Sequence, residues 1–334
     1  MLTGSKGWRI TIAAILACTI WAAAAGADDA APGDYSLVIA EDATTVTYRN
    51  ADGQAVQIRK HAKRTVALLT SLLDLWIEAG GTAVGRNSTR QFVPEHLRNL
   101  PEVGSFANLN VERLLVLNPD LVISADLGNI RAVMPMLEAN HTDIALFDYT
   151  NYYDYRAIFE LFGKLNGTEA RCRAALAGVQ KAVDDIVGKV RGLAPPKVLI
   201  IFATPNIVNS ELPNSNTGVM LEMLGGINIV AHARFGKRMR VNFSLERIVE
   251  MDPDLILVNT MGDIGKSKDR LTRDLTENAA WATLRAVREN RIHLLPKELF
   301  LYKPNADFPR SLQYLAAIMY PDAFPAGTAA AEGN

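Results

Sequence analysis

The chain is poor in cysteine and in net charge, and each shortage excludes a class of protein. Its 334 residues contain only Cys18 and Cys172, too few for a disulfide framework. The 35 basic and 36 acidic side chains nearly balance, to a formal net charge of −1. Nucleic-acid-binding proteins concentrate basic residues, so we expect no nucleic-acid partner.

Long hydrophobic runs are also scarce, with one exception near the amino terminus. Residues 10–25 are uncharged and follow Lys6 and Arg9, but this run is too short and too rich in alanine for a permanent membrane anchor. The small residues up to Ala27 match a signal-peptidase site. We therefore predict that residues 1–27 are a signal peptide and that the mature protein is periplasmic, with a net charge of −3 once the two basic residues are removed.

Residues 15–18 offer an alternative processing site. They loosely match a lipobox, which would make Cys18 the lipidated first residue of the mature chain. Cleavage there leaves an apolar segment with Trp21 where lipoproteins carry a polar tether, so cleavage after Ala27 is preferred. Cys172 is then the only cysteine of the mature protein, which excludes an intramolecular disulfide.

The mature sequence begins with a β-rich stretch and continues as alternating strands and helices. Residues 35–60 alternate apolar and polar side chains around an Asn-Ala-Asp-Gly turn, which predicts a β-hairpin. Strand-like runs and helical patterns then alternate, at residues 66–69, 72–79, 111–117, 121–123, 133–138 and 144–147. This order is typical of parallel βα units in an α/β fold.

An internal repeat indicates how the α/β units are organised. Residues 110–123 recur as residues 244–257, 134 positions later. Each copy has a helix-capping residue, a short helix with Glu in its first turn, a Pro-Asp turn and a buried strand. Two copies this far apart predict two lobes of similar construction rather than a solenoid.

One long helical pattern lies between the two copies. Apolar residues recur every three or four positions over residues 168–191, a length that spans roughly 36 Å as a helix. The predicted fold is therefore α/β, with two doubly wound lobes joined by one stiff helix and preceded by a small β-hairpin. The expected segments are a first lobe at 28–167, the bridging helix at 168–191, a second lobe at 192–325 and a disordered tail at 326–334.

The phosphate-binding and nucleophile motifs of two-lobed α/β enzymes are missing. The first strand is followed by Leu69-Thr70-Ser71-Leu72, with no glycine where a dinucleotide-binding turn needs one. The sequence has no Walker A motif and no Gly-x-Ser-x-Gly elbow. A binding protein with no catalytic residues and no cofactor is therefore favoured over the alternative, an enzyme of the same architecture.

Histidine is scarce and dispersed, which argues against direct capture of a bare divalent metal. Five histidines are present and none has a ligand-like spacing to another: His61, His96, His141, His232 and His293. We predict no metal site made by the protein alone. His96 and His232 are candidate axial ligands only if the cargo carries a metal with an open position, as haem does.

Four stretches of the sequence carry a resemblance: residues 46–53 followed by 63–67, residues 104–106 ahead of the first repeat copy, the second copy, and residues 163–167 before the long helix. Together they resemble the helix-bridged (class III) periplasmic solute-binding proteins of ABC importers for siderophores, haem and cobalamin. The resemblance covers nearly the whole mature chain and implies two Rossmann-like lobes. It also implies a monomer that captures an iron(III)-siderophore or related metal chelate for transport, with a haem or corrinoid cargo as the alternative.

The resemblance gives the two repeated glutamates a role. It implies that Glu112 and Glu246, one at the tip of each lobe, form salt bridges with arginines on the two copies of the inner-membrane permease. A structural explanation stands beside this one, because the macrodipole favours a glutamate in the first turn of any helix by about 0.3 to 1 kcal/mol. The matched positions favour the docking role, since a two-fold permease needs two matched anions.

The candidate ligand-binding residues lie on loops at the carboxyl ends of the predicted strands, where α/β lobes bind ligands. Phe106 is added because the resemblance places an aromatic wall there. The cations among them suit a negatively charged, partly flat chelate, which the tyrosines would stack against. The basic run of Arg234, Lys237, Arg238 and Arg240 is interpreted as a solvated surface. The predicted ligand-binding residues are Ser71, Arg86, Arg90, Phe106, Tyr149, Tyr153, Asn206, Asn209, Asn259, Tyr302 and Lys303.

Overall fold

The computed structural model describes residues 36–325, apart from 90–92, 106–107, 127, 231–237, 243 and 277–278. The predicted signal peptide at 1–27 and the tail at 326–334 lie outside the described residues, as do Arg90, Phe106 and His232. Within the described ranges, no helix is both long enough and apolar enough to cross a membrane.

A three-stranded antiparallel sheet opens the described chain. Strands β2 (Thr45–Arg49) and β3 (Ala55–Arg59) form the predicted hairpin, and β1 (Val38–Glu41) adds a strand that the hairpin prediction did not include. Gly53 in the turn has φ 77°, a conformation that favours glycine. The Asn50 side chain accepts hydrogen bonds from the backbone of Asp52 and Gln54, each at 2.9 Å, which fixes the turn.

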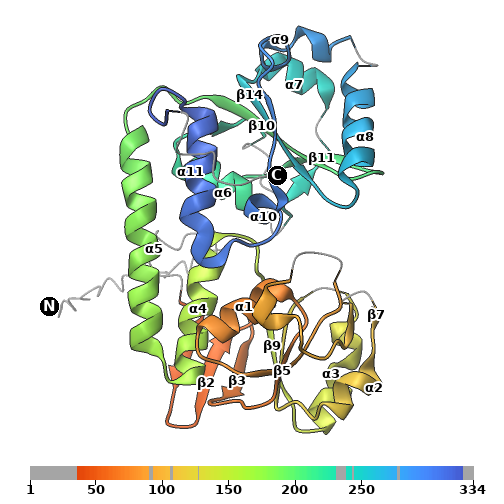
Figure 1. Cartoon of the computed structure of the whole chain (residues 1–334), viewed down its shortest axis with the longest axis vertical. Helices are drawn as coiled ribbons and strands as arrows, with labels where there is room; N and C mark the ends of the chain where they lie inside the picture. Colours follow the sequence, from red (N-terminus) through yellow and green to blue (C-terminus); the bar gives the residue numbers. More distant parts are fainter. Residues whose placement is uncertain are drawn as a thin grey trace, which may run out of the picture. The chain divides into compact units, whose positions relative to one another are not determined.

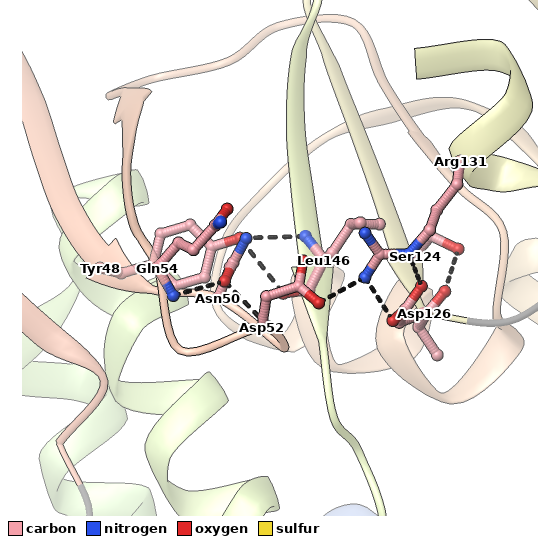
Figure 2. A network of polar contacts seen from close by, with 9 residues as sticks. Tyr48, Asn50, Asp52, Gln54, Ser124, Asp126, Arg131 and Leu146 are labelled. Atoms are coloured by element: carbon pink, nitrogen blue, oxygen red, sulfur yellow. Dashed lines mark hydrogen bonds and ion pairs between the residues drawn. The ribbon is translucent and has the colours of Figure 1, made fainter.

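Polar contacts fasten this small sheet to the first lobe (Figure 2). The buried Tyr48 hydroxyl accepts a hydrogen bond from the Leu146 backbone N–H at 2.9 Å and lies 3.3 Å from the Leu146 carbonyl oxygen. The Arg131 guanidinium forms ion pairs with Asp52 at 2.7 Å and with Asp126 at 2.5 Å. The hairpin thereby covers an edge strand of the first lobe, which would otherwise expose unpaired backbone groups.

The first lobe contains a parallel sheet with the strand order β5-β4-β8-β9. Successive residues of its strands pack into two different cores: Ile123 and Phe147 face one, and Val122 and Leu146 face the other. Both faces are buried, which explains the continuous apolar runs. The elements are β4 (Thr65–Ala67), α1 (Thr70–Glu78), β5 (Ala83–Arg86), β6 (Gly104–Ser105), β7 (Asn108–Leu109), α2 (Val111–Val116), β8 (Leu121–Ala125), α3 (Ile130–Ala139) and β9 (Asp143–Phe147).

The second lobe contains a mixed sheet with the strand order β13-β11-β10-β14-β15, and β12 pairs with β10. Strands β10, β14 and β15 are parallel, whereas β11 runs antiparallel to β10. Helices again cover both faces, since β10 and β14 contribute to two cores. The elements are β10 (Lys197–Ala203), β11 (Val208–Glu211), α6 (Asn216–Met223), β12 (Ile227–Asn228), β13 (Arg240–Val241), α7 (Leu245–Met251), β14 (Leu255–Thr260), α8 (Ile264–Thr276), α9 (Arg285–Arg288), β15 (Ile292–Leu294) and α10 (Lys297–Phe300).

The predicted long helix is α5 (Glu169–Val190), and it packs against both α4 (Tyr152–Asn166) and α11 (Phe308–Met319) (Figure 1). The rings of Tyr152 in α4 and Phe308 in α11 stack with centroids 4.2 Å apart. The sequence analysis placed Tyr153 on a loop, and this was wrong. Tyr153 lies in the first turn of α4, which begins there because Asn151 and Asp154 form a capping box.

The internal repeat takes the same local structure in both lobes. Asn110 and Ser244 cap α2 and α7 through their side chains. After each helix comes a residue in the left-handed region, Asn118 at φ 43° and Asp252 at φ 41°, where Asn and Asp are tolerated. The Pro-Asp turn then leads into β8 or β14.

The aspartate of the Pro-Asp turn has the same structural role in both copies of the repeat. The Asp120 carboxylate accepts hydrogen bonds from the backbone N–H groups of Lys63 and Arg64 at 2.7 and 2.9 Å, just before β4. Asp254 accepts one from Lys197, the first residue of β10, at 2.8 Å. Each aspartate therefore fixes the start of the first strand of its own lobe.

Candidate ligand-binding site

A cavity of about 850 Å³ is lined by residues of both lobes, a size typical of small-molecule sites. Its first-lobe residues follow β5 or adjoin β6, and its second-lobe residues follow β14 or lie in and after α10. This matches the expectation that ligands bind near the carboxyl ends of the strands. The described lining residues are Ser88, Thr89, Glu102, Ser105, Met261, Gly262, Asp263, Lys297, Leu301 and Tyr302.

The cavity lining combines apolar and polar groups and carries charges of both signs. The Glu102 carboxylate accepts a hydrogen bond from Ser88 and lies beside Arg86, and these two contacts hold its pKa below the ordinary range. The Lys297 ammonium donates a hydrogen bond to the Gly262 carbonyl at 2.5 Å. Hydroxyl groups and the exposed Met261 side chain complete a surface that can hydrogen-bond a polar ligand and also contact apolar parts of it.

Arg86 is at the carboxyl end of β5, as the sequence prediction required, but its guanidinium is engaged by the protein. The residue is only 7% exposed, and one Nη atom lies 2.7 Å from Glu102 Oε1. The guanidinium also donates hydrogen bonds to the carbonyls of Asn87 and Arg98 at 3.0 and 3.1 Å. These bonds fix the loops that form the cavity wall.

Two other predicted residues meet at a polar contact between the lobes. The buried Tyr149 hydroxyl donates to Asn305 Oδ1, and Asn305 Nδ2 donates to the Ser71 carbonyl at 3.1 Å. Burial raises the Tyr149 pKa well above its ordinary value, so the phenol stays protonated and can donate. Tyr149 and Ser71 therefore join the lobes through Asn305.

Lys303 makes a second contact between the lobes. It follows α10 in the second lobe, and its ammonium donates a hydrogen bond to the carbonyl of Thr150, which follows β9 in the first lobe. Burial lowers the Lys303 pKa to about 8, although Glu211 and Asp154 oppose this shift. The Lys303 ammonium thus has a protein carbonyl as its partner. Lys303 is not among the described residues that line the cavity.

Three predicted asparagines occupy different environments. Asn259, at the end of β14, is buried and donates to Glu211 at 3.1 Å and to Thr217 at 2.8 Å. Asn209 is half-buried in β11, and Asn206 is exposed in the turn before it. None of them is among the described lining residues, and neither is Tyr153, whose backbone N–H donates to the Asn151 side chain at 2.9 Å.

The described histidines are also spread apart. His61 and His141 occupy turns with positive φ, and His293 lies in β15. His96 Nε2 is 3.4 Å from the Asp74 carboxylate and is mostly exposed. Across the described ranges, no group of three or more His, Cys, Asp or Glu side chains is arranged to hold a metal ion.

Tyr302 is the one predicted ligand residue found among the described lining residues. Ser88, Thr89, Met261 and Gly262 also directly follow strands, whose ends can be located from hydrophobic patterns, although the sequence analysis did not single these residues out. Glu102, Ser105 and Asp263 were missed. Glu102 and Ser105 belong to a segment that joins the edge of the sheet through contacts between Arg86 and Glu102, which hydrophobic patterns do not reveal.

The two glutamates of the repeat are exposed on short helices. Glu112 lies in the first turn of α2 and Glu246 in the first turn of α7, as predicted. Within the described part of the chain, neither forms an ion pair. Their carboxylates are therefore available to a partner.

A family model described as periplasmic binding protein matches residues 66–299, which include every described residue that lines the cavity except Leu301 and Tyr302. The chain belongs to the periplasmic binding protein family. This confirms the family that the sequence motifs indicated. Members of the periplasmic binding protein family are substrate-binding proteins of transport systems rather than enzymes.

Curated relatives and solved structures agree with this membership. An uncharacterized ABC transporter substrate-binding lipoprotein, YvrC of Bacillus subtilis, is 25% identical over 283 residues, 84% of this chain and 87% of the relative. The high-affinity heme uptake system protein IsdE of Staphylococcus aureus is 22% identical over 267 residues, 77% of this chain and 86% of the relative.

The solved structures show the same two-lobed fold. The structure of S. aureus IsdE complexed with heme has a TM-score of 0.68 at 20% identity, covering 77% of this chain and 98% of that one. The petrobactin-binding protein YclQ of B. subtilis has a TM-score of 0.64 at 18% identity, covering 84% and 99%.

Proposed function

We propose that this member of the periplasmic binding protein family is the substrate-binding protein of an ABC importer and carries an iron(III)-siderophore or related metal chelate. The observation that carries the proposal is the cavity of about 850 Å³ that both lobes line. Its hydroxyl, charged and apolar groups suit a ligand with a polar periphery. The names of its relatives, which refer to heme uptake and petrobactin binding, favour a metal chelate and keep haem as the second candidate.

The protein binds its cargo without chemical change. The cavity walls come from two lobes that α5 joins, and a continuous helix resists wide hinge opening, so closure on the cargo is small. The cargo-loaded form then docks on the permease through Glu112 and Glu246. The mature protein is a periplasmic monomer whose signal peptide is cleaved after Ala27.

Purification from the native host tests the cargo. Native mass spectrometry should find one chelate bound per chain, and the absorption spectrum should distinguish an iron(III)-siderophore from haem or a corrinoid. The same preparation gives the amino-terminal residue by intact mass, which should be Asp28. A protein that carries no chelate, and binds neither iron(III)-siderophores nor haem when these are added, would contradict the proposed cargo class.

Charge reversal tests the docking role. A strain lacking the gene should regain cargo uptake when it expresses the wild-type protein but not the Glu112→Arg/Glu246→Arg double variant. Cargo affinity of the double variant in solution should stay within about threefold, because both residues lie outside the cavity lining. Normal uptake by the double variant would remove the docking assignment.

A further inference from the structure

The two copies of the internal repeat differ at one exposed position beside the docking glutamates. Val116 in α2 is 83% exposed, the highest value among the exposed large hydrophobic residues of the described chain. The corresponding position of the second copy, 134 residues later, is Glu250 in α7. An apolar side chain this exposed on one lobe therefore has a charged counterpart on the other.

Val116 forms part of a recess of about 430 Å³ in the first lobe, beside Glu112. Glu112 and Val116 are four residues apart on the same helix and so lie on one face of it. The recess combines apolar walls with charged groups. Its described lining residues are Pro101, Glu102, Val103, Glu112, Arg113, Val116 and Leu117.

The second lobe has a different contact at the matching place. Arg247 and Glu250 form an ion pair at 2.7 Å within α7. In α2 the matching residues are Arg113 and Val116, so this ion pair cannot form there. The first lobe thus presents an apolar group beside its docking glutamate, whereas the second presents a self-paired polar surface.

We propose that the recess beside Glu112 receives an apolar side chain of the importer's permease, from a segment that also presents a cation to Glu112. The proposal rests on the docking role proposed above and assigns different chemistry to the two docking surfaces. The charges favour this occupant: Glu102 is already paired with Arg86, whereas the exposed Glu112 forms no ion pair among the described residues and can pair with the cation. The contact at Glu246 is then wholly polar.

Exchanging the residues at the two matched positions tests the proposal. Val116→Glu gives α2 the residue that α7 carries and lets it pair with Arg113, while Glu250→Val does the reverse on α7. Both sites are exposed, so both variants should fold and bind cargo like the wild type. We expect Val116→Glu to lower uptake in the complemented deletion strain by at least about tenfold, since burial of a valine in the complex is lost. Glu250→Val should change uptake less than about twofold.

A binding assay with the purified importer in lipid nanodiscs identifies the kind of interaction lost. The affinity defect of Val116→Glu should persist between 0.05 and 0.5 M salt, because an apolar contact is not screened. Normal uptake by Val116→Glu, with the Glu112→Arg/Glu246→Arg variant inactive, would contradict the proposed role of the recess. The docking role of the two glutamates would remain. If the double variant also transports normally, the docking role fails and the inference fails with it.

Light scattering during gel filtration tests a second copy of this chain as the occupant. The proposal expects a monomer for both the wild type and Val116→Glu. A wild-type dimer that Val116→Glu dissociates would assign the recess to self-association and overturn the proposal.

Discussion

Arg86 and Glu102 form an ion pair at 2.7 Å, and Glu102 lines both the ligand cavity and the recess beside Glu112. The backbone reinforces this link. Arg86 N–H donates to the Pro101 carbonyl, and Val103 N–H donates to the Arg86 carbonyl, both at 2.9 Å. The Asn110 N–H, at the cap of the docking helix α2, donates in turn to the Val103 carbonyl at 2.8 Å. One short segment therefore joins the wall of the ligand cavity to the docking surface.

Replacing Arg86 should mainly destabilise the protein. Arg86→Ala removes an ion pair and two hydrogen bonds to carbonyls at a buried position, so we expect the free energy of unfolding to fall by roughly 2 to 4 kcal/mol in urea denaturation. Glu102→Gln is the control and should cost less than about 1 kcal/mol, because its side chain is 43% exposed. A fully stable Arg86→Ala protein with weakened, salt-sensitive cargo binding would instead support the direct anion contact predicted from the sequence.

Cargo affinity should depend on Tyr302 and not on Asn206. Tyr302 lines the cavity, so Tyr302→Ala should weaken binding by about tenfold, through loss of an aromatic contact surface. Asn206 is exposed and is not among the described lining residues, so Asn206→Ala should change affinity less than about twofold. Isothermal titration with the cargo found in the native protein measures both. Equal affinities for the two variants would mean that the cargo occupies another surface.

The continuity of α5 can be tested with two substitutions that should change the free energy of unfolding in opposite directions. Val183→Pro in the middle of the helix removes a backbone hydrogen bond and clashes with the preceding turn, which should cost about 3 kcal/mol or more. Gly178→Ala should stabilise the protein by about 0.5 to 1 kcal/mol, because a Cβ there meets no atom within 4 Å. Both values come from chemical denaturation. A neutral Val183→Pro would show that the segment is not one rigid helix in solution.

Lys303 should make stability depend on alkaline pH. Its pKa is about 8 in the folded protein, against an ordinary value of 10.5, so the unfolded chain binds more protons between these two pH values. The unfolding free energy of the wild type relative to Lys303→Met should therefore rise as the pH increases through this interval. Below this pH interval, the lysine is charged in both the folded and the unfolded protein, so the free-energy cost of burying that charge is fully present. A difference that stays constant or falls with pH would contradict the lowered pKa.

Local patterns in the sequence determined the elements and their organisation. Apolar runs and helical spacing located β8, β9 and α5 to within about two residues, because one or two faces of each element are buried along its whole length. The repeat predicted two similar lobes, and its capping residues and turn aspartates perform the same local tasks in both. The glutamates of α2 and α7 were found in the same way, since their positions follow from local helix chemistry.

The tertiary structure alone decided which of the polar residues line the cavity. Arg86, Tyr149 and Asn259 end or follow strands and Lys303 follows α10, yet each is engaged by residues outside its own element. A buried charged or polar group must find a partner, and that partner is fixed by long-range packing rather than by neighbours along the chain. The recess beside Glu112 likewise depends on residues 101–103 lying against α2. No periodicity in the sequence encodes that contact.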